Sequence, residues 1–292
     1  MKTAKIVSIV VWSVVALLLT ALLIVGIAAD FRLGSFSIGF SGLRYDNAEA
    51  YSVGDALLPA DNIQQVEINW TSGSVRVEAY NGEKISIKET GAENEEQKLR
   101  YLSRDGKLTI QYCKSRAFFG IFKNPEKELT LLVPAQMAED LKTFKIDSAS
   151  TKINISDIAS QEFEIETVSG DCKFTNIQTA VVNLDAVSAD IEMSGSIGGL
   201  DIDITSGTCT IDNDVMPYEI DYDGVSGDFT MAMPEGSGFN LKHDKVSGDF
   251  FCEFPTSHES GRYIYGDGSA NYNFDTVSGN VTLNRKQPSI SE

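Results

Sequence analysis

The chain has 292 residues, and its 24 Lys and Arg side chains against 42 Asp and Glu give a formal net charge of −18 at pH 7. This surplus of carboxylates argues against a nucleic-acid partner, whose phosphates would be repelled, and against broad adsorption to an anionic membrane surface. The length fits one or two domains and a hydrophobic core that is stable without disulfides.

The N-terminal residues predict a membrane anchor. Residues 6–29 form a run of 24 without a charged side chain, and Lys2 and Lys5 precede it in the segment 1–5. A bilayer core needs about 20 apolar residues as a helix. Because basic residues stay cytoplasmic, we expect a single-pass transmembrane helix in the cell membrane, with residues 1–5 in the cytoplasm and the C-terminal domain extracytoplasmic. A cleaved signal peptide is the alternative, since small residues occupy 26–29, although signal h-regions are usually about 7–15 residues long.

Residues 30–62 contain Gly and Ser with weak patterning, and we expect a juxtamembrane stalk there. A phrase of the type Val-Ser-Gly-Asp then recurs. From its second copy onward its serines are 18 to 21 residues apart, except for an interval of 31 before the last copy, which is typical of repeat architectures. The eight serines are Ser72, Ser148, Ser169, Ser188, Ser206, Ser226, Ser247 and Ser278.

Alignment of the copies on their serines shows four apolar columns, six and four residues before the serine and three and five residues after it. In the weak second copy, Asp147–Ser150, alignment on Ser148 places Lys142 and Thr151 in two of these columns. The positions between the columns are mostly polar, which is the period-2 pattern of half-buried strands. Around Ser206 the columns hold Leu200, Ile202, Cys209 and Ile211.

Each unit therefore predicts a strand, a Ser-Gly corner, a second strand and a second turn, with no room for a helix. We expect an all-β fold, a β-solenoid or parallel β-helix-like stack of two-strand coils of about 20 residues, over residues 63–285, with 286–292 as a tail. Equivalent residues stack about 4.8 Å apart, and each coil contacts its neighbours. Glycine suits the corner because it accepts a positive φ, and the serine hydroxyls are expected to bond the turn backbone.

The region between the first two copies is less regular. Residues 98–103 and 107–113 alternate around Arg104–Gly106, which predicts a hairpin, and residues 129–133 resume the apolar alternation.

The sequence resembles a known family in several phrases taken together. These are Tyr51–Asp55, Ile68–Val75, the repeated Val-Ser-Gly-Asp units, and Tyr265–Gly268 before Thr276–Gly279. They are similar to the bacterial putative-adhesin family of β-strand-repeat envelope proteins, across roughly residues 50–285. The resemblance implies a small, membrane-anchored envelope protein of a Gram-positive bacterium, of a kind sometimes encoded beside envelope-stress genes. The family has no established catalytic residues, so the resemblance implies no active site.

Cysteines and histidines predict packing rather than chemistry. Cys172 and Cys209 share a column but lie two coils, or about 9–10 Å, apart, which is too far for a disulfide. We expect them, with Cys252, to be buried free thiols. His243 falls in an apolar column and is expected to pack in the core, whereas His258 is expected in a solvated loop.

An acidic column is the first candidate site. Asp171, Asp190, Asp228 and Asp249 each follow a repeat serine by two residues, with Thr208 interrupting. Stacked carboxylates can hold Ca²⁺, or they can cap the turn and stay solvated, and the spacing does not match calcium-binding β-roll repeats. Paired carboxylates are also typical of glycosidases, but here they follow the repeat period instead of gathering once. We therefore expect no catalytic residues and no cofactor.

A basic, aromatic segment, Lys114–Lys123, is the second candidate site. An exposed apolar tip flanked by cations can contact lipid headgroups or a protein partner. Alternatively, its Phe side chains fold back and cap the open end of the solenoid. The predicted contact residues are Arg116, Phe118, Phe119, Ile121, Phe122 and Lys123.

These features predict a non-catalytic binding, adhesin-like or structural role at the cell envelope. The expected partners are the membrane, through the anchor, and an envelope glycan or a membrane protein. An envelope-stress accessory that senses or modulates a membrane signalling partner is the alternative, and a glycan-active β-helix enzyme is the second alternative.

Overall fold

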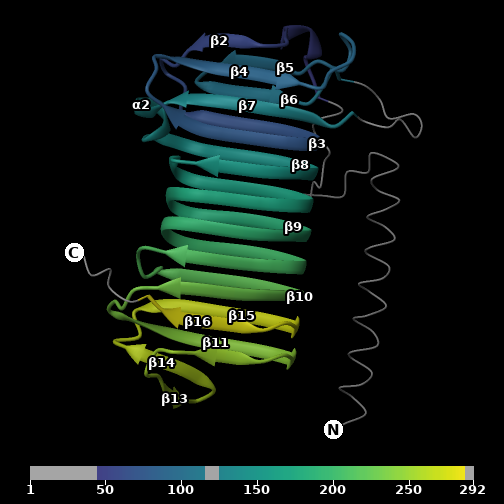
Figure 1. Cartoon of the computed structure of the whole chain (residues 1–292). Coiled ribbons are helices and arrows are strands. Elements are labelled where there is room, and N and C mark those ends of the chain that lie inside the picture. The colour runs from purple at the N-terminus through teal and green to yellow at the C-terminus, as the bar shows by residue number, and fades with distance from the viewer. Residues whose placement is uncertain (1–44, 116–124, 287–292) are drawn as a thin grey trace, which may run out of the picture.

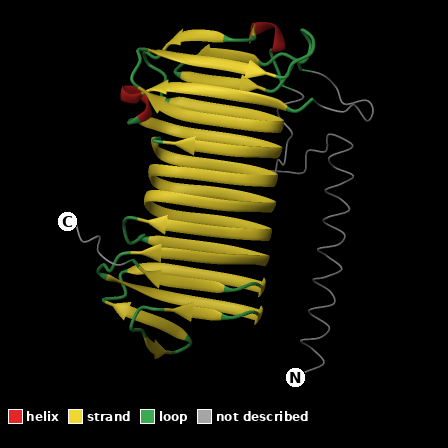
Figure 2. Cartoon of the chain, in the orientation of Figure 1, coloured by secondary structure: helices red, strands yellow, loops and turns green. Residues whose placement is uncertain are grey.

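The computed structural model describes residues 45–115 and 125–286. Over these residues the chain forms a single 16-stranded sheet wound into stacked coils (Figures 1 and 2). The expected transmembrane helix, 6–29, lies outside the described residues. Within them, no helix has the length and apolar character needed to cross a membrane.

Strands make up most of the described residues, which contain one short 3₁₀ helix (η1) and one short α-helix, and this confirms the predicted all-β class there. In chain order the elements are η1 (Ala48–Ala50), β1 (Ser52–Val53), β2 (Ala56–Pro59), β3 (Gln65–Tyr80), β4 (Lys84–Thr90), β5 (Arg100–Arg104), β6 (Lys107–Gln111), β7 (Lys127–Pro134), α2 (Ala135–Ala138), β8 (Leu141–Ser156), β9 (Ala159–Asn213), β10 (Glu219–Met233), β11 (Gly238–Ser247), β12 (Phe250–Cys252), β13 (Ser257–Glu259), β14 (Arg262–Gly266), β15 (Ala270–Ser278) and β16 (Val281–Arg285).

The middle of the molecule is the predicted ladder of coils. Strands β3, β8, β9 and β10 pair in parallel, and β9 alone runs as one continuous strand through three coils. In each coil a first strand leads to the Ser-Gly corner and a second strand leads away from it. In Figure 1 the corners lie on the right and the second turns on the left. Inward residues meet across the coils, as Ile153 pairs with Cys172 and Cys209 with Phe229.

The Ser-Gly corners bring neighbouring coils into close contact. Gly207 has φ +121°, and a Cβ atom there would lie 2.0 Å from the Ala189 carbonyl oxygen, so only glycine fits. Ser169 Oγ donates to the carbonyl of Ala149 at 3.2 Å. This serine therefore ties its corner to the preceding coil, whereas we expected a bond within its own turn.

The weak second copy of the repeat has a different register from the one predicted. Ser150, rather than Ser148, pairs with both Ser72 and Ser169. The predicted alignment was displaced by two residues, which keeps the same side chains inward because the period of a strand is two. The corrected register removes Lys142 from the apolar columns.

Sequence order and spatial order differ at both ends of the stack. The last coil, β15 and β16, inserts between β10 and the coil formed by β11 and β12. At the other end β6 and β7 form a coil that pairs with β3, outside it. The expectation that consecutive coils are always spatial neighbours is therefore wrong at the ends.

Antiparallel strands close each end. Strand β5 pairs with β6, as the predicted hairpin required, and β4 pairs with β7. Strands β1 and β2 pair with β5 and β4, so residues 52–59 belong to the sheet and not to the expected stalk. Strands β14 and β13 close the opposite end.

One continuous hydrophobic core runs through the stack. None of the four cysteines, all within the described residues, forms a disulfide. Cys113, Cys172 and Cys209 are buried as small apolar side chains, whereas Cys252, which we expected to be buried, is only half-buried. Burial raises the pKa of the Cys172 thiol, helped by Asp171, and that of the Cys209 thiol, each to about 12, so neither is a nucleophile at neutral pH.

Both histidines differ from their predicted positions, since His243 is not fully packed in the core and His258 is not in a loop. His243 is half-buried against Phe250 and Phe274, and burial lowers its pKa. His258 is exposed, and it lies on strand β13 against Tyr263, where we expected a loop.

Candidate functional site

The acidic column predicted to bind calcium, here called the corner column, is not a continuous stack of carboxylates. Thr208 lies between Asp190 and Asp228, and the inserted last coil places Asn280 between Asp228 and Asp249. No group of three or more His, Cys, Asp and Glu side chains in residues 45–115 and 125–286 is arranged to hold a metal ion.

Two of the four acids of the corner column, Asp190 and Asp228, bond through their carboxylates to the backbone of neighbouring coils. Asp190 Oδ1 accepts the Thr208 N–H at 3.0 Å and the Thr208 hydroxyl at 2.7 Å. Asp228 Oδ1 accepts the Asn280 N–H at 2.8 Å. The corner column therefore stabilises the stacking of the coils. This resembles the predicted alternative in which the acids cap turns, except that the bonds run to a neighbouring coil.

A second acidic column lies on the other side of the corner, three residues before each serine, and we call it the carboxylate column. Its members point outward from the first strand of seven successive coils. At about 4.8 Å per coil the column is roughly 29 Å long. In spatial order the members are Asp147, Glu166, Asp185, Asp203, Asp223, Asp275 and Asp244.

Within the described residues, lysines pair with the carboxylate column at its two ends only. Lys145 Nζ lies 3.5 Å from Asp147 and 2.5 Å from Glu166, and Lys242 Nζ lies 2.6 Å from Asp244. Between these ends, and including two Asp residues of the adjacent outward position, six carboxylates form no ion pair within the described part of the chain. They are Asp185, Asp201, Asp203, Asp221, Asp223 and Asp275.

Electrostatic repulsion marks this central stretch. Partial burial between neighbouring coils, together with repulsion from adjacent carboxylates, raises the pKa of Asp185, Asp203 and Asp223 above the ordinary value. Each charge therefore opposes folding slightly at neutral pH, so these charges contribute nothing to the stability of the coils.

The carboxylate column was not predicted from the sequence, although its members occupy a fixed place in the repeat. The position three residues before the serine is acidic in most copies. Seeing it as a continuous column requires two structural facts, the register through Ser150 and the insertion of Asp275 between Asp223 and Asp244.

Only the flanks of the basic aromatic segment lie within the described residues. Its predicted contact residues, Arg116, Phe118, Phe119, Ile121, Phe122 and Lys123, lie outside the described residues. Its flanks are described, and they lie at the corner of the coil formed by β6 and β7, where Lys127 pairs with Gly73. Its alternative role as a cap stays a prediction.

A buried lysine anchors these flanks. Lys127 is fully buried, and its Nζ lies 2.9 Å from Glu89 Oε2 and donates to the carbonyl of Gln97 at 2.6 Å. It also lies over the rings of Trp70 and Tyr112, 4.8 and 4.2 Å from their centroids. Burial lowers the pKa of Lys127, while Glu89 opposes that shift. The cluster fixes the position at which the segment leaves the coil.

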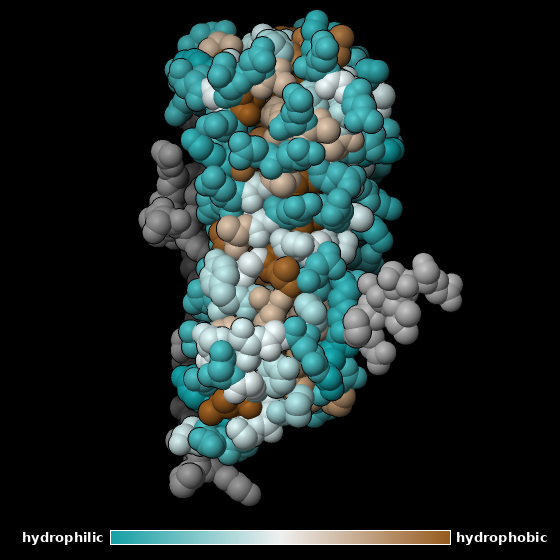
Figure 3. Space-filling model, turned by 90° about the vertical axis from the view of Figure 1, so that its left-hand side faces the viewer, coloured by the Kyte–Doolittle hydropathy of each residue, from teal (hydrophilic) through white to brown (hydrophobic). Residues whose placement is uncertain are grey.

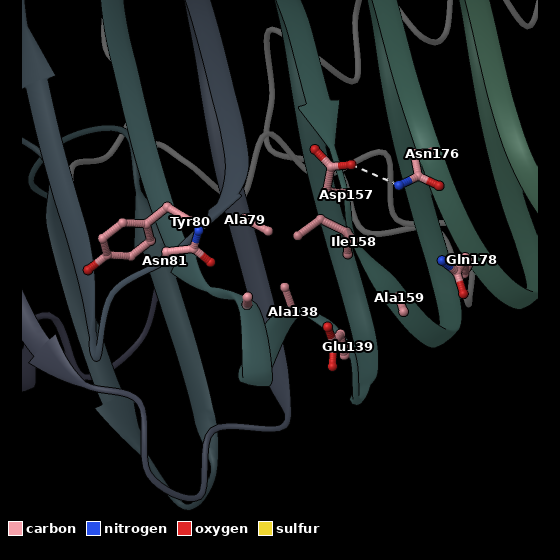
Figure 4. A pocket seen from close by; sticks show the side chains of 11 residues that line it. Ala79, Tyr80, Asn81, Ala138, Glu139, Asp157, Ile158, Ala159, Asn176 and Gln178 are labelled. Carbon is pink, nitrogen blue, oxygen red and sulfur yellow. Dashed lines mark hydrogen bonds between the residues drawn. The ribbon is translucent and has the colours of Figure 1, made fainter.

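A cleft of about 340 Å³ lies on the opposite edge, at the second turns. Figure 3 views this edge, along which apolar patches alternate with hydrophilic side chains. The cleft lies where helix α2 joins β7 to β8, and its rim carries the polar side chains shown in Figure 4. These are Tyr80, Asn81, Glu139, Asp157, Asn176 and Gln178, of which Tyr80 donates its hydroxyl to the Lys84 carbonyl.

Comparison with known proteins places the chain in a family. A family model described as Toastrack DUF4097 matches residues 63–284, and a search of curated proteins found no match. Three solved structures are similar. A putative cell adhesion protein from Clostridium sporogenes has 12% identity over 81% of this chain and 100% of that chain, with a TM-score of 0.38. A putative adhesin from Bacteroides fragilis has 11% identity over 81% and 97%, with a TM-score of 0.42, and one from Parabacteroides distasonis has 13% over 82% and 99%, with a TM-score of 0.46.

The resemblance predicted from the repeated phrases is thus confirmed. Because the family model covers most of its length, the chain belongs to the Toastrack DUF4097 family.

Proposed function

We propose that this protein is a membrane-anchored, extracytoplasmic β-repeat protein with a non-catalytic binding role at the cell envelope, and that the carboxylate column is its binding surface. The partner carries cationic groups along an extended stretch, as a basic segment of a membrane protein or an amine-bearing envelope polymer does. The anchor is the apolar run at residues 6–29.

The central observation is a row of like charges that opposes folding. Asp185, Asp203 and Asp223 have raised pKa values and form no ion pair in residues 45–115 and 125–286. A feature that violates local physical consistency is expected where function requires it. A cationic partner would relieve the repulsion, and a long row of charges would also accelerate its association.

Two triple variants test this proposal with equal changes in net charge. One replaces Asp185, Asp203 and Asp223 with Ala, and the other replaces three residues of the corner column, Asp190, Asp228 and Asp249. We expect labelled octalysine to bind the full-length protein at low salt, and to bind the first variant at least fivefold more weakly and the second less than twofold more weakly. Equal weakening by the two variants would show that net charge alone drives binding.

The anchor has a separate test. Full-length protein should stay in the membrane pellet after alkaline extraction, and a variant with Leu17, Leu18 and Leu19 replaced by Lys should not. Release of the unaltered protein would contradict the anchor.

A second candidate function is an accessory to a membrane signalling partner, and one observation favours it. Ser115 Oγ donates to the Tyr45 carbonyl at 3.0 Å and accepts the Tyr45 N–H at 3.1 Å. Tyr45 is the first described residue after the expected anchor, and Ser115 is the last described residue before the predicted contact residues of the basic aromatic segment. The two hydrogen bonds therefore hold the anchor side of the chain next to the start of that segment. Replacing Phe118, Phe119 and Phe122 with Ser should abolish signalling while the melting temperature is unchanged, and a variant that still signals would contradict this function.

A further inference from the structure

The cleft at the second turns results from an irregular crossing of the chain. Helix α2 connects β7 to β8, but β3 lies between these two strands in the sheet. The connection must therefore pass over the end of β3, where Ala79 and Asn81 lie. The short helix makes this crossing and leaves a hollow between itself and the turns of the next coils (Figure 4).

The floor of this hollow is small and apolar. Four alanines and Ile158 line it, and the longer side chains of the lining, Tyr80 among them, still leave the space open; the alanines are Ala79, Ala135, Ala138 and Ala159. At about 340 Å³ the cleft is at the lower end of the range for ligand sites, about 300–1,000 Å³, and accommodates a small molecule or one or two rings of a larger one.

Two of the rim residues are held in place before any ligand arrives. Asn176 Nδ2 donates to Asp157 Oδ1 at 2.8 Å, and both residues have a positive φ, 53° and 59°. Asp and Asn tolerate this left-handed conformation better than other non-glycine residues. The bond joins the turns of adjacent coils, so the spacing of these polar groups is set by the stacking of the sheet. Such preorganisation lowers the cost of binding.

The rim chemistry selects the class of ligand. It offers three amides, from Asn81, Asn176 and Gln178, and two carboxylates, from Glu139 and Asp157, with no Lys, Arg or His among the lining residues. Amides donate and accept hydrogen bonds, while carboxylates only accept. An anionic ligand would find no cation and two like charges. A cationic ligand would pair with the carboxylates but make no use of the donor N–H groups of Asn81 and Gln178.

Hydroxyl groups donate and accept, and therefore match this mixed rim, and the C–H faces of a sugar ring match an apolar floor. We propose that this cleft binds an uncharged saccharide of one or two rings. The proposal goes beyond the binding role of the carboxylate column, because the two surfaces share no residue, and either can fail without the other.

The test is calorimetric titration of the full-length protein with four sugars and one peptide. The sugars are N-acetylglucosamine, its β-1,4-linked dimer, maltose, and N-acetylmuramic acid, which adds a carboxylate to N-acetylglucosamine, and the peptide is tetralysine. We expect at least one uncharged sugar to bind, and N-acetylmuramic acid to bind at least tenfold more weakly than N-acetylglucosamine or its dimer. Because tetralysine can also bind the carboxylate column, it is titrated into the variant with Asp185, Asp203 and Asp223 replaced by Ala. Tighter binding of tetralysine than of every sugar to that variant, or no binding of any uncharged sugar, would overturn the proposal.

Variants locate the binding. Asn176→Gly removes the amide and keeps a residue that accepts the positive φ, and Gln178→Ala removes a second amide; each should weaken sugar binding at least fivefold. Ala159→Leu should fill the floor and abolish it. Asn284→Ala removes the same amide from strand β16, outside the cleft, and should change nothing. Sugar binding that survives both Ala159→Leu and Asn176→Gly, in proteins with unchanged melting temperatures, would place the site elsewhere and contradict the proposal.

Discussion

The two acidic columns run along the same coils, on either side of the Ser-Gly corner, yet they relate to the fold in opposite ways. In the corner column, Asp228 accepts a backbone N–H from the next coil in space, and uncharged residues separate the acids from Asp190 to Asp249. In the carboxylate column, Asp203 faces Asp223 directly and both have raised pKa values. The same residue type thus holds the coils together in one column and strains them in the other. A periodic acidic residue in a solenoid is therefore not in itself a sign of a binding site.

The largest expected effect on stability comes from placing a carboxylate on the inward side of a strand. Ile202 lies between Asp201 and Asp203 but points into the core. Ile202→Asp should lower the free energy of unfolding by about 4 kcal/mol or more, because the new charge is buried without a partner. Urea unfolding measures this, with Thr210→Asp on an outward position as control. A melting midpoint and circular dichroism spectrum unchanged by Ile202→Asp would refute the inward assignment.

The hydrogen bonds of the corner column depend on the close approach of neighbouring coils at the Ser-Gly corner. Gly207→Ala places a Cβ 2.0 Å from the Ala189 carbonyl oxygen, and should cost about 2–4 kcal/mol. Gly261 also has a positive φ, +80°, but nothing lies within 4 Å of its added Cβ, so Gly261→Ala should cost only about 1 kcal/mol. Equal losses from the two variants would mean that the corner is looser than described.

Loss of one bond in the corner column should have a moderate effect. Asp228→Ala leaves the Asn280 N–H without its acceptor and should cost about 1 kcal/mol. Asp171, in the same column, makes no hydrogen bond through its carboxylate in the described part of the chain, and Asp171→Ala should be nearly neutral. If Asp171→Ala were as costly as Asp228→Ala, the hydrogen bond would not be the source of the stabilisation.

The smallest effect has the opposite sign. Asp203→Asn removes one charge from the carboxylate column and should raise the free energy of unfolding at pH 7, by less than about 1 kcal/mol because the side chain is open to solvent. The raised folded-state pKa means that the folded protein binds this proton more tightly than the unfolded chain, so the cost of the native Asp disappears as the pH falls towards its ordinary pKa. The gain from Asp203→Asn should therefore shrink at pH 4, and also in 0.5 M NaCl. A gain that is unaffected by pH and salt would not be electrostatic.

Much of the fold could be predicted from side-chain periodicity. The inward columns, the two-strand coil and the corner glycines follow from alternation and from backbone sterics, which are local. The displaced register at Ser150 could not be found in this way, because a shift of two residues keeps Ile153 on the inward side.

The interleaved ends depend on contacts between distant segments that leave no local pattern. The position of Asn280 between Asp228 and Asp249, which removes the expected calcium ladder, is one consequence. The carboxylate column and the cleft depend on the same long-range order. Asp275 completes the column from another part of the chain, and the cleft exists because α2 crosses the end of β3.

The central claim, that one acidic column stabilises the coils while the other strains them, is tested most directly by the thermal melts of the two triple variants at pH 7 and low salt. In each variant three Asp residues are replaced by Ala, so both lose three negative charges. The account predicts that replacing Asp185, Asp203 and Asp223 raises the melting temperature, and that replacing Asp190, Asp228 and Asp249 lowers it. Shifts of the same sign and size in both variants would contradict it.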